Sequence, residues 1–231
     1  SVMDDAAALG AQDAANLTSV FQNADKADDL KAVMEVAKAT LGTDDGSGTN
    51  KLDVRNKANL TSVFQNADKA SDLKEVMTAA ADVGITDAAN LTAVFQNADQ
   101  ASDLKDVMED AKALATTGDT SLFTSVMQNA DQAASVKKVV AAAKTGGASA
   151  NIDNVLRNAS SADKLSKLVD KTSTGGTVNA SLLDTVLENA DKAEDLFDVV
   201  DAAETTGGES FDVTSLLENA DKADKLKSLV D

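Results

Sequence analysis

One short block of sequence returns throughout this chain, and its spacing constrains the fold more than any other feature. Residues 20–27 read Val-Phe-Gln-Asn-Ala-Asp-Lys-Ala, recur unchanged at 63–70 and recur with one substitution at 94–101. With looser copies included, seven copies are centred on Asn23, Asn66, Asn97, Asn129, Asn158, Asn189 and Asn219. Subtracting successive asparagine positions gives steps of 43, 31, 32, 29, 31 and 30 residues. A fixed period in this range is typical of tandem-repeat architectures.

Each copy carries apolar residues at the spacing of two successive amphipathic helices. Before the first asparagine, one helical face is formed by Leu17, Val20, Phe21 and Ala24. After it, the same spacing continues through Ala27, Leu30, Val33, Met34 and Ala37. A hairpin of about 31 residues cannot bury its apolar faces alone, so neighbouring hairpins must supply the core. The sequence therefore predicts an all-α fold, an α-solenoid of about seven tandem helical-hairpin repeats of ~31 residues, with 1–231 forming a single repeat array.

In form, this arrangement resembles the helical-hairpin solenoids, such as tetratricopeptide, HEAT and armadillo arrays. The resemblance extends over the whole chain but is architectural only. The Trp, Tyr and Pro landmarks of the tetratricopeptide unit are missing, because the chain contains none of these residues. With only six Phe for aromatics, the core must consist of Ala, Val, Leu and a few Met. Four methionines recur at core positions, namely Met34, Met77, Met108 and Met127.

The repeated Asn-Ala-Asp triplet is interpreted as a helix-terminating device and not as a binding site. Asn tolerates the left-handed conformation that ends a helix, and Asp two residues later is a favourable N-cap for the next helix. A second acid three residues on, as in Asp25 and Asp28, resembles a capping box. Ser160 replaces the aspartate in the fifth copy and is also a good N-cap residue. The glycine pairs at 146–147, 175–176 and 207–208 are expected to close second helices.

Charge and composition exclude several classes of function. The chain has 39 acidic and 21 basic residues, for a formal net charge of −18, which disfavours binding to nucleic acid and to anionic membranes. No apolar run approaches the roughly 20 residues that a membrane-spanning helix needs, so we expect a soluble protein without membrane insertion. Without Cys or His there is no thiol nucleophile, no Cys/His zinc site and no Ser-His-Asp relay.

Catalysis by Asp, Lys and Ser remains chemically feasible, but a catalytic site breaks a repeat pattern and these acids follow it. We therefore expect no enzyme activity, no catalytic residues, no cofactor and no metal site. The one segment that resembles a ligand loop is the insertion at 42–58, where residues 42–53 mix acidic oxygens with Gly, Ser and Asn, as Ca²⁺ prefers. The EF-hand order and its closing Glu are absent, so a flexible surface loop between two hairpins is favoured over a Ca²⁺ site.

Two functional hypotheses remain open. The first is a non-catalytic structural segment of a large extracellular or cell-surface bacterial protein, acting as a spacer, lattice or adhesin stalk. Near-identical neighbouring copies, the absence of Cys and the acidic, Lys-rich surface favour it, although Cys-free acidic proteins also occur in the cytoplasm. The alternative is a protein- or peptide-binding helical-repeat scaffold. One acid is kept at an equivalent position in several copies, which indicates a uniform solvated face and not a tailored groove: Asp29, Asp72, Asp103 and Asp195.

The ends of the chain also bear on its partners. It lacks a basic and apolar leader, starts without Met and ends on the repeat pattern, so we expect a segment of a longer repetitive protein. Neither terminal helix is then a dedicated polar cap. We therefore expect self-association through the array ends, or fraying there.

Overall fold

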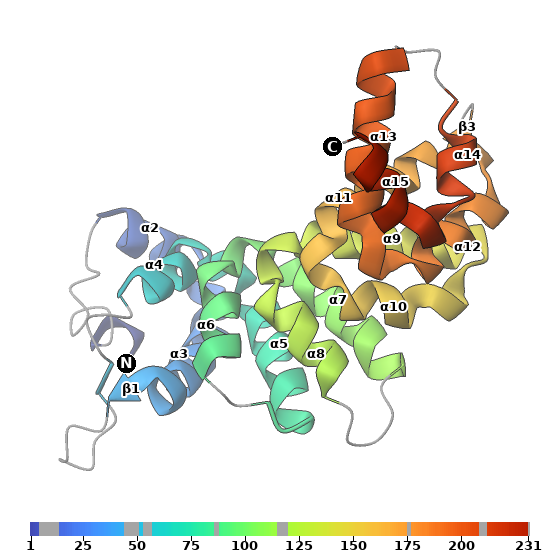
Figure 1. The fold of residues 1–231 in the computed structure, drawn as a ribbon. Helices are drawn as coiled ribbons and strands as arrows, with labels where there is room; N and C mark the ends of the chain where they lie inside the picture. The colour runs from blue at the N-terminus through green and yellow to red at the C-terminus, as the bar shows by residue number, and fades with distance from the viewer. Residues whose placement is uncertain are drawn as a thin grey trace. The chain divides into compact units, whose positions relative to one another are not determined.

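The computed structural model describes residues 1–4, 14–43, 51–52, 57–85, 88–114, 120–174, 177–207 and 212–230. Within these ranges the regular structure is helical apart from two very short β-ribbons, so the all-α prediction is confirmed (Figure 1). The chain divides into two compact units, Ser1–Asp131 and Gln132–Asp231. The boundary falls within a 3₁₀-helix, η5, at Ala130–Gln132. That residues 1–231 form one array stays a prediction.

Unit 1 is built from two layers of helices that alternate along the chain. The first helices of its hairpins are α2 (Ala14–Gln22), α4 (Lys57–Gln65), α6 (Ala88–Gln96) and α8 (Ser121–Gln128). The second helices are α3 (Ala27–Leu41), α5 (Ala70–Asp82) and α7 (Ala101–Leu114). Each first helix packs beside the next first helix, and each second helix beside the next second helix. Consecutive hairpins therefore pack side by side within this unit.

Unit 2 is also built from two layers of helices that alternate along the chain. One layer contains α10 (Ile152–Arg157), α12 (Ala180–Glu188) and α14 (Thr214–Leu217). The other contains α9 (Ala133–Gly146), α11 (Ala162–Lys171), α13 (Ala193–Gly207) and α15 (Ala223–Val230). Helices of one layer again pack in chain order, and a 3₁₀-helix, η6 (Ser149–Asn151), precedes α10.

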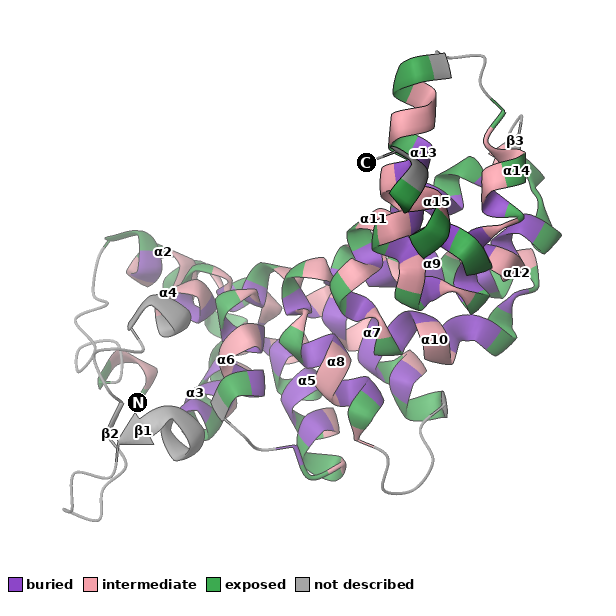
Figure 2. Ribbon diagram, viewed as in Figure 1, coloured by how far each residue is buried: buried purple, intermediate pink, exposed green. Residues whose placement is uncertain are grey.

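The core of both units consists of small and medium apolar side chains, as the composition predicts. Figure 2 shows buried residues at intervals along the helices of both units, between intermediate and exposed ones. The two alanines of the motif are fully or almost fully buried in the second to the seventh copies. The four methionines predicted at core positions are also buried, with at most 5% exposure.

The turn between the two helices of a hairpin differs from the sequence prediction. No non-glycine residue among those described has a positive φ, and the motif asparagines lie near φ −110°, so the predicted left-handed asparagine is wrong. Instead, Asn66 Nδ2 donates a hydrogen bond to the Ser62 carbonyl at 2.9 Å, beside the bond from its own backbone N–H at 3.1 Å. The same side-chain bond to the residue four positions earlier occurs in all seven copies.

A 3₁₀-turn follows the asparagine and contains the residue that was predicted to be the N-cap of the second helix. The turns are η1 (Ala24–Lys26), η3 (Ala67–Lys69), η4 (Ala98–Gln100), η5, η7 (Ala159–Ser161), η8 (Ala190–Lys192) and η9 (Ala220–Lys222). The motif aspartate, or Ser160 in the fifth copy, lies inside this turn. The N-cap residues of α5, α9 and α11 are Lys69, Gln132 and Ser161, respectively, and none of them makes a side-chain capping hydrogen bond. The N-cap prediction is therefore wrong. The aspartate remains near a helix N-terminus, where a negative charge is favoured by the helix dipole.

The predicted glycine stops have mixed outcomes. Gly147 ends α9 in the left-handed conformation, with φ +82°, as predicted. An ideal Cβ at Gly146 would lie 2.3 Å from Leu183 Cδ2, so a larger residue there would force the buried Leu183 side chain to move. Gly207 is the last residue of α13, while Gly208 and 175–176 lie outside the described residues.

Two antiparallel ribbons replace helix at the hairpin junctions. In unit 2, α11 ends before β3 (Ser173–Thr174), which pairs with β4 (Thr177–Val178). In the insertion at 42–58, β1 (Gly42–Thr43) pairs with β2 (Lys51–Leu52), with Gly42 opposite Leu52. The remaining residues proposed for a Ca²⁺ loop, 44–50 and Asp53, lie outside the described residues.

Candidate functional site

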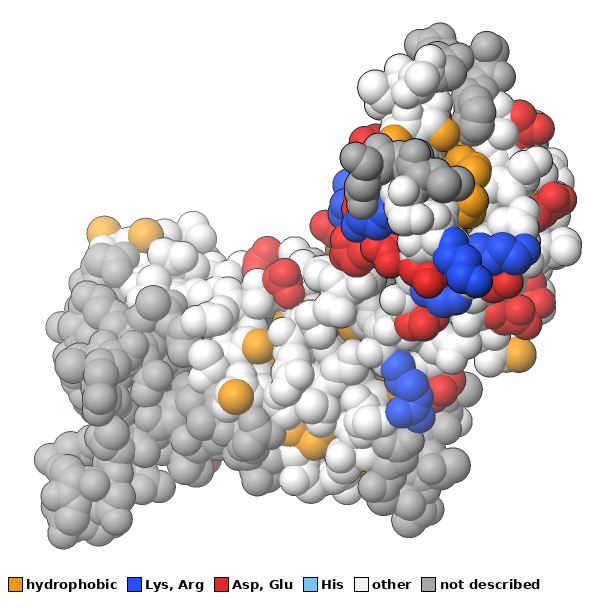
Figure 3. All heavy atoms as spheres, in the orientation of Figure 1, with side chains coloured by type: hydrophobic (Ala, Val, Ile, Leu, Met, Phe, Trp, Pro, Cys, Tyr) orange, Lys and Arg blue, Asp and Glu red, His pale blue; other side chains and the backbone are white. Residues whose placement is uncertain are grey.

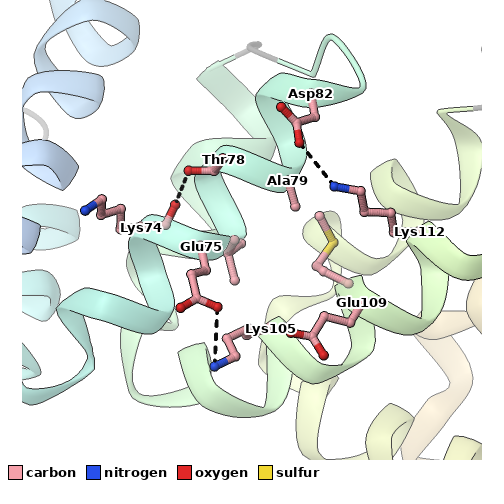
Figure 4. A pocket seen from close by; sticks show the side chains of 10 residues that line it. Lys74, Glu75, Thr78, Ala79, Asp82, Lys105, Glu109 and Lys112 are labelled. Carbon is pink, nitrogen blue, oxygen red and sulfur yellow. Dashed lines mark hydrogen bonds and ion pairs between the residues drawn. The ribbon is translucent and has the colours of Figure 1, made fainter.

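A groove between α5 and α7 of unit 1 is lined by both apolar and charged side chains (Figure 4). Its volume is about 240 Å³, and its floor includes Met108 and Val76. Charged side chains surround this floor: Lys74, Lys105, Lys112, Glu75, Asp82 and Glu109. In the close-up, lysines of one helix approach acids of the other, so the rim is formed by paired charges.

A second groove of about 250 Å³ lies between α3 and α5. It shares Lys74, Thr78 and Asp82 with the first groove and has Val33 and Val36 on its other side. The two grooves therefore recur between successive second helices. Such recurrence follows from the packing of equivalent helices and does not by itself mark one of them as a specific site.

Ion pairs between neighbouring hairpins occur at equivalent positions along the repeats. Lys74 Nζ lies 2.7 Å from Asp29, and Lys105 Nζ lies 3.2 Å from Asp72. Counted from the motif asparagine, each pair joins the eighth residue of one copy to the sixth residue of the preceding copy. In unit 2, Lys227 makes the same pair with Asp195 at 3.0 Å.

Hydroxyl groups extend these pairs into short networks. Ser71 Oγ donates to Asp29 at 2.7 Å and accepts from Lys26 at 3.2 Å. One repeat later, Ser102 Oγ donates to Asp72 at 2.6 Å and accepts from Lys69 at 3.2 Å. The first helices are also joined, because Ser19 and Ser62 donate to the Gln65 and Gln96 carbonyls at 3.0 and 3.2 Å.

In unit 2, a lysine at a different position of the copy also contacts acidic side chains. Lys164 lies 3.8 Å from Glu194 and 3.5 Å from Asp198, and its ammonium group stands 4.3 Å from the centre of the Phe197 ring. Lys227 reaches the same Asp198 at 2.8 Å. Figure 3 shows basic and acidic side chains next to one another on the visible face of this unit.

The pKa shifts keep these groups in their charged forms. Hydrogen bonds from Lys74 and Ser71 lower the pKa of Asp29. Partial burial raises the pKa of Asp72, but hydrogen bonds from Ser102 and Lys105 outweigh it and leave that pKa below its ordinary value. The Asp29 carboxylate in turn raises the pKa of Lys74, and Asp198 followed by Asp195 raises the pKa of Lys227. A nucleophilic lysine requires the opposite shift, so this chemistry favours ion pairing.

Sequence reasoning did not find these contacts. Asp29, Asp72 and Asp195 were predicted to be part of a solvated face, yet each binds a lysine of the following hairpin. The recurring Asp-Leu-Lys sequence could have suggested an ion pair between an aspartate and a lysine. Only the packing of the hairpins shows that the two residues of each pair come from different copies. Buried asparagines were also missed, namely Asn16, Asn90 and Asn151.

Within the part of the chain that the structure describes, no group of three or more acids is arranged to hold a metal ion. The described helices also include none with the length and apolar character needed to cross a bilayer. Comparison with protein-family models, with curated proteins and with solved structures gives no match. The function must therefore be inferred from the chain's own geometry.

Proposed function

We propose that the chain is a non-catalytic α-solenoid of about seven tandem hairpins, serving as a structural segment of a large extracellular or cell-surface bacterial protein. A spacer, lattice or adhesin stalk needs a regular length and a hydrated surface. It does not need catalytic residues. Tandem repeats provide length through nearest-neighbour packing. The strongly negative charge supports a hydrated exterior.

The observation that carries this proposal is that the motif residues themselves join one hairpin to the next. The apolar positions supply the core, and the lysine at the eighth position binds the aspartate of the preceding copy in Asp29–Lys74, Asp72–Lys105 and Asp195–Lys227. In these three pairs, residues at equivalent positions of the copies join one hairpin to the next. Their charged states are reinforced by their partners, which favours a passive role over a catalytic one.

Removing one whole period tests the repeat architecture. Deletion of residues 67–97 removes 31 residues and joins Asn66 to Ala98, which restores the Asn-Ala-Asp motif. We expect the shortened chain to keep its helical ellipticity per residue and a cooperative urea transition. Deletion of 67–82, which removes the second helix without restoring the register, serves as the control. Equal loss of structure in both variants would contradict the solenoid.

Cellular location tests the structural role. An antibody raised against the whole chain should label intact, non-permeabilised bacteria that carry the parent protein. Fractionation of the same cells should recover the antigen with the envelope or the medium. Recovery in the cytosol alone would contradict the surface proposal, whatever the outcome of the deletion experiment.

The second candidate function is a scaffold that binds a protein or peptide. It is favoured by the two equivalent grooves of unit 1, which have apolar floors and lysine rims. A pull-down with the intact chain, compared with a double variant of two exposed groove residues, Val36→Ser and Lys112→Ser, tests it. A partner retained by the wild type and lost by the variant supports this function, and recovery of no partner above background contradicts it.

A further inference from the structure

The first hairpin exposes an apolar surface that the later copies bury. Phe21 is 64% exposed, whereas Phe64 and Phe95, at the same position in the second and third copies, are fully buried. Ala24 and Ala27 are exposed as well, although their counterparts are buried in the second to seventh copies. We call Val20, Phe21, Ala24 and Ala27 the N-terminal face.

This face forms one side of a groove of about 530 Å³. Val2 and Met3 approach it from the chain start, and Asp28 and Lys31 lie at its edge. The groove therefore combines an apolar floor with one acidic and one basic group.

The last hairpin lacks cover on the opposite side. Leu226 is only half-buried, whereas the residue at its position is buried in the six preceding copies. Leu216 is half-buried too, although its counterparts in the second to sixth copies are buried. Lys222 and Lys225 are exposed beside them. We call Leu216, Lys222, Lys225 and Leu226 the C-terminal face.

We propose that the N-terminal face binds the C-terminal face of a second molecule of this chain, head to tail, in the register used between consecutive hairpins. This inference rests on the proposed solenoid and concerns molecules that consist of residues 1–231 alone. The chain indicates the occupant itself, because residues 63–70 repeat residues 20–27 and are covered by a hairpin. An interface between unlike surfaces does not close on itself in a pair, so assembly continues beyond two molecules.

Polar groups on the two faces match contacts already present in unit 2. Lys192 donates to the Asp221 carbonyl of the next hairpin, and Lys222 would reach the Asp25 carbonyl in the same way. Lys164 approaches Glu194 at 3.8 Å, and Lys225 would meet Asp28, which occupies the corresponding position. Both lysines of the C-terminal face would thus find an acceptor beside the N-terminal face.

One group departs from the pattern. Lys31 corresponds to Lys74, but Lys225 replaces the aspartate that Lys74 binds in the preceding hairpin. Glu35, 3.8 Å from Lys31, offsets this positive charge. Each molecule also has a formal charge of −18, so the contact should strengthen when salt screens the repulsion.

Sedimentation equilibrium on the full chain tests the proposal at 0.15 and 0.5 M NaCl. We expect the weight-average mass to rise with concentration, beyond that of a pair, and to rise more at 0.5 M. Phe21→Asp should weaken association at least tenfold while leaving the circular-dichroism melt unchanged, because Phe21 is exposed. Val178→Asp, at an exposed apolar residue outside both faces, is the matched control and should associate like the wild type.

Mixing variants tests the head-to-tail geometry. The double variant Lys222→Glu, Lys225→Glu should lose self-association, as Phe21→Asp does, because each variant has only one intact face and the contact needs both. A mixture of the two should form 1:1 pairs that grow no further. If the C-terminal variant still self-associates and the mixture does not pair, the contact joins two N-terminal faces and the proposal is overturned.

A wild-type mass that stays at one chain at every concentration also overturns it. The deletion of residues 67–97 would then still report on the solenoid, since its readout is folding and not association. A monomeric chain whose one-period deletion folds therefore rejects this inference alone.

Discussion

The first and second hairpins contain the same eight-residue block, fold it into the same local structure and bury it differently. In both, the asparagine side chain bonds the carbonyl four residues earlier at 2.9 Å, and a 3₁₀-turn follows. Yet Phe21 is 64% exposed and Phe64 is fully buried. Local structure therefore follows from the sequence of the copy, whereas burial depends on the hairpin that precedes it.

The largest expected difference between the two hairpins concerns these phenylalanines. Phe64→Ala should destabilise the protein by about 3–5 kcal/mol, because it leaves a cavity in a packed core. Phe21→Ala should change stability by no more than about 0.5 kcal/mol, as at an exposed site. Urea unfolding followed by circular dichroism at a concentration where the chain is monomeric measures both. Similar losses for the two variants would contradict the assigned burial.

Substitutions of the motif alanines should show the same contrast, with a smaller loss of stability. Ala67 is fully buried and Ala24 is exposed. Ala67→Leu should cost about 1–3 kcal/mol through overpacking, while Ala24→Leu should be tolerated. Urea unfolding of the two variants gives the comparison, and a destabilised Ala24→Leu would show that the first hairpin is already covered.

Substitutions of the two motif asparagines should have similar effects on stability, because the local turn is the same in both hairpins. Asn23→Ala and Asn66→Ala each remove one hydrogen bond to a backbone carbonyl and should each cost about 1 kcal/mol. Asn66→Asp should cost more than Asn66→Ala at pH 7, because a carboxylate cannot donate and would face the Ser62 carbonyl. The relevant measurement is the change in urea midpoint. An effect restricted to the second hairpin would mean that the turn depends on its neighbour.

The ion pairs between hairpins should have the smallest effect, with a distinct pH dependence. Folding lowers the pKa of Asp72 from its ordinary value of 3.8, so its ionised form contributes stability above that value. This contribution is lost as the pH falls through the lowered pKa. Asp72→Asn should thus be less stable than the wild type at pH 7, and the difference should shrink below pH 3.8.

Urea titrations of both proteins at pH 7, 5 and 3 measure this difference. Asp68→Asn, which changes an exposed acid of the same hairpin, provides the control for the change in net charge. If the two variants respond identically to pH, the contact between Asp72 and Lys105 contributes nothing specific.

The helical hairpins were predictable because the apolar spacing of each copy is that of two amphipathic helices. Residues 27–37 show this spacing, and α3 contains them. The turn was not predictable from residue preferences. Asparagine and aspartate favour several local structures, and the asparagine used its amide to bind the preceding carbonyl while the aspartate entered a 3₁₀-turn.

The candidate site was only partly accessible from sequence. Composition excluded Cys and His chemistry, but it could not reveal that Asp72 bonds both Ser102 and Lys105 of the next hairpin. That network depends on the distance between two helices whose bonded residues, Asp72 and Ser102, are 30 positions apart in the chain.

The sequence by itself determined the all-α class, the period of the motif and the apolar positions, because these follow from the order of residues, from local propensity and from the spacing of side chains around a helix. Tertiary structure alone decided which of those apolar positions lose contact with water and which acids meet a lysine. Both properties belong to pairs of neighbouring hairpins, and identical copies differ in them whenever their neighbours differ.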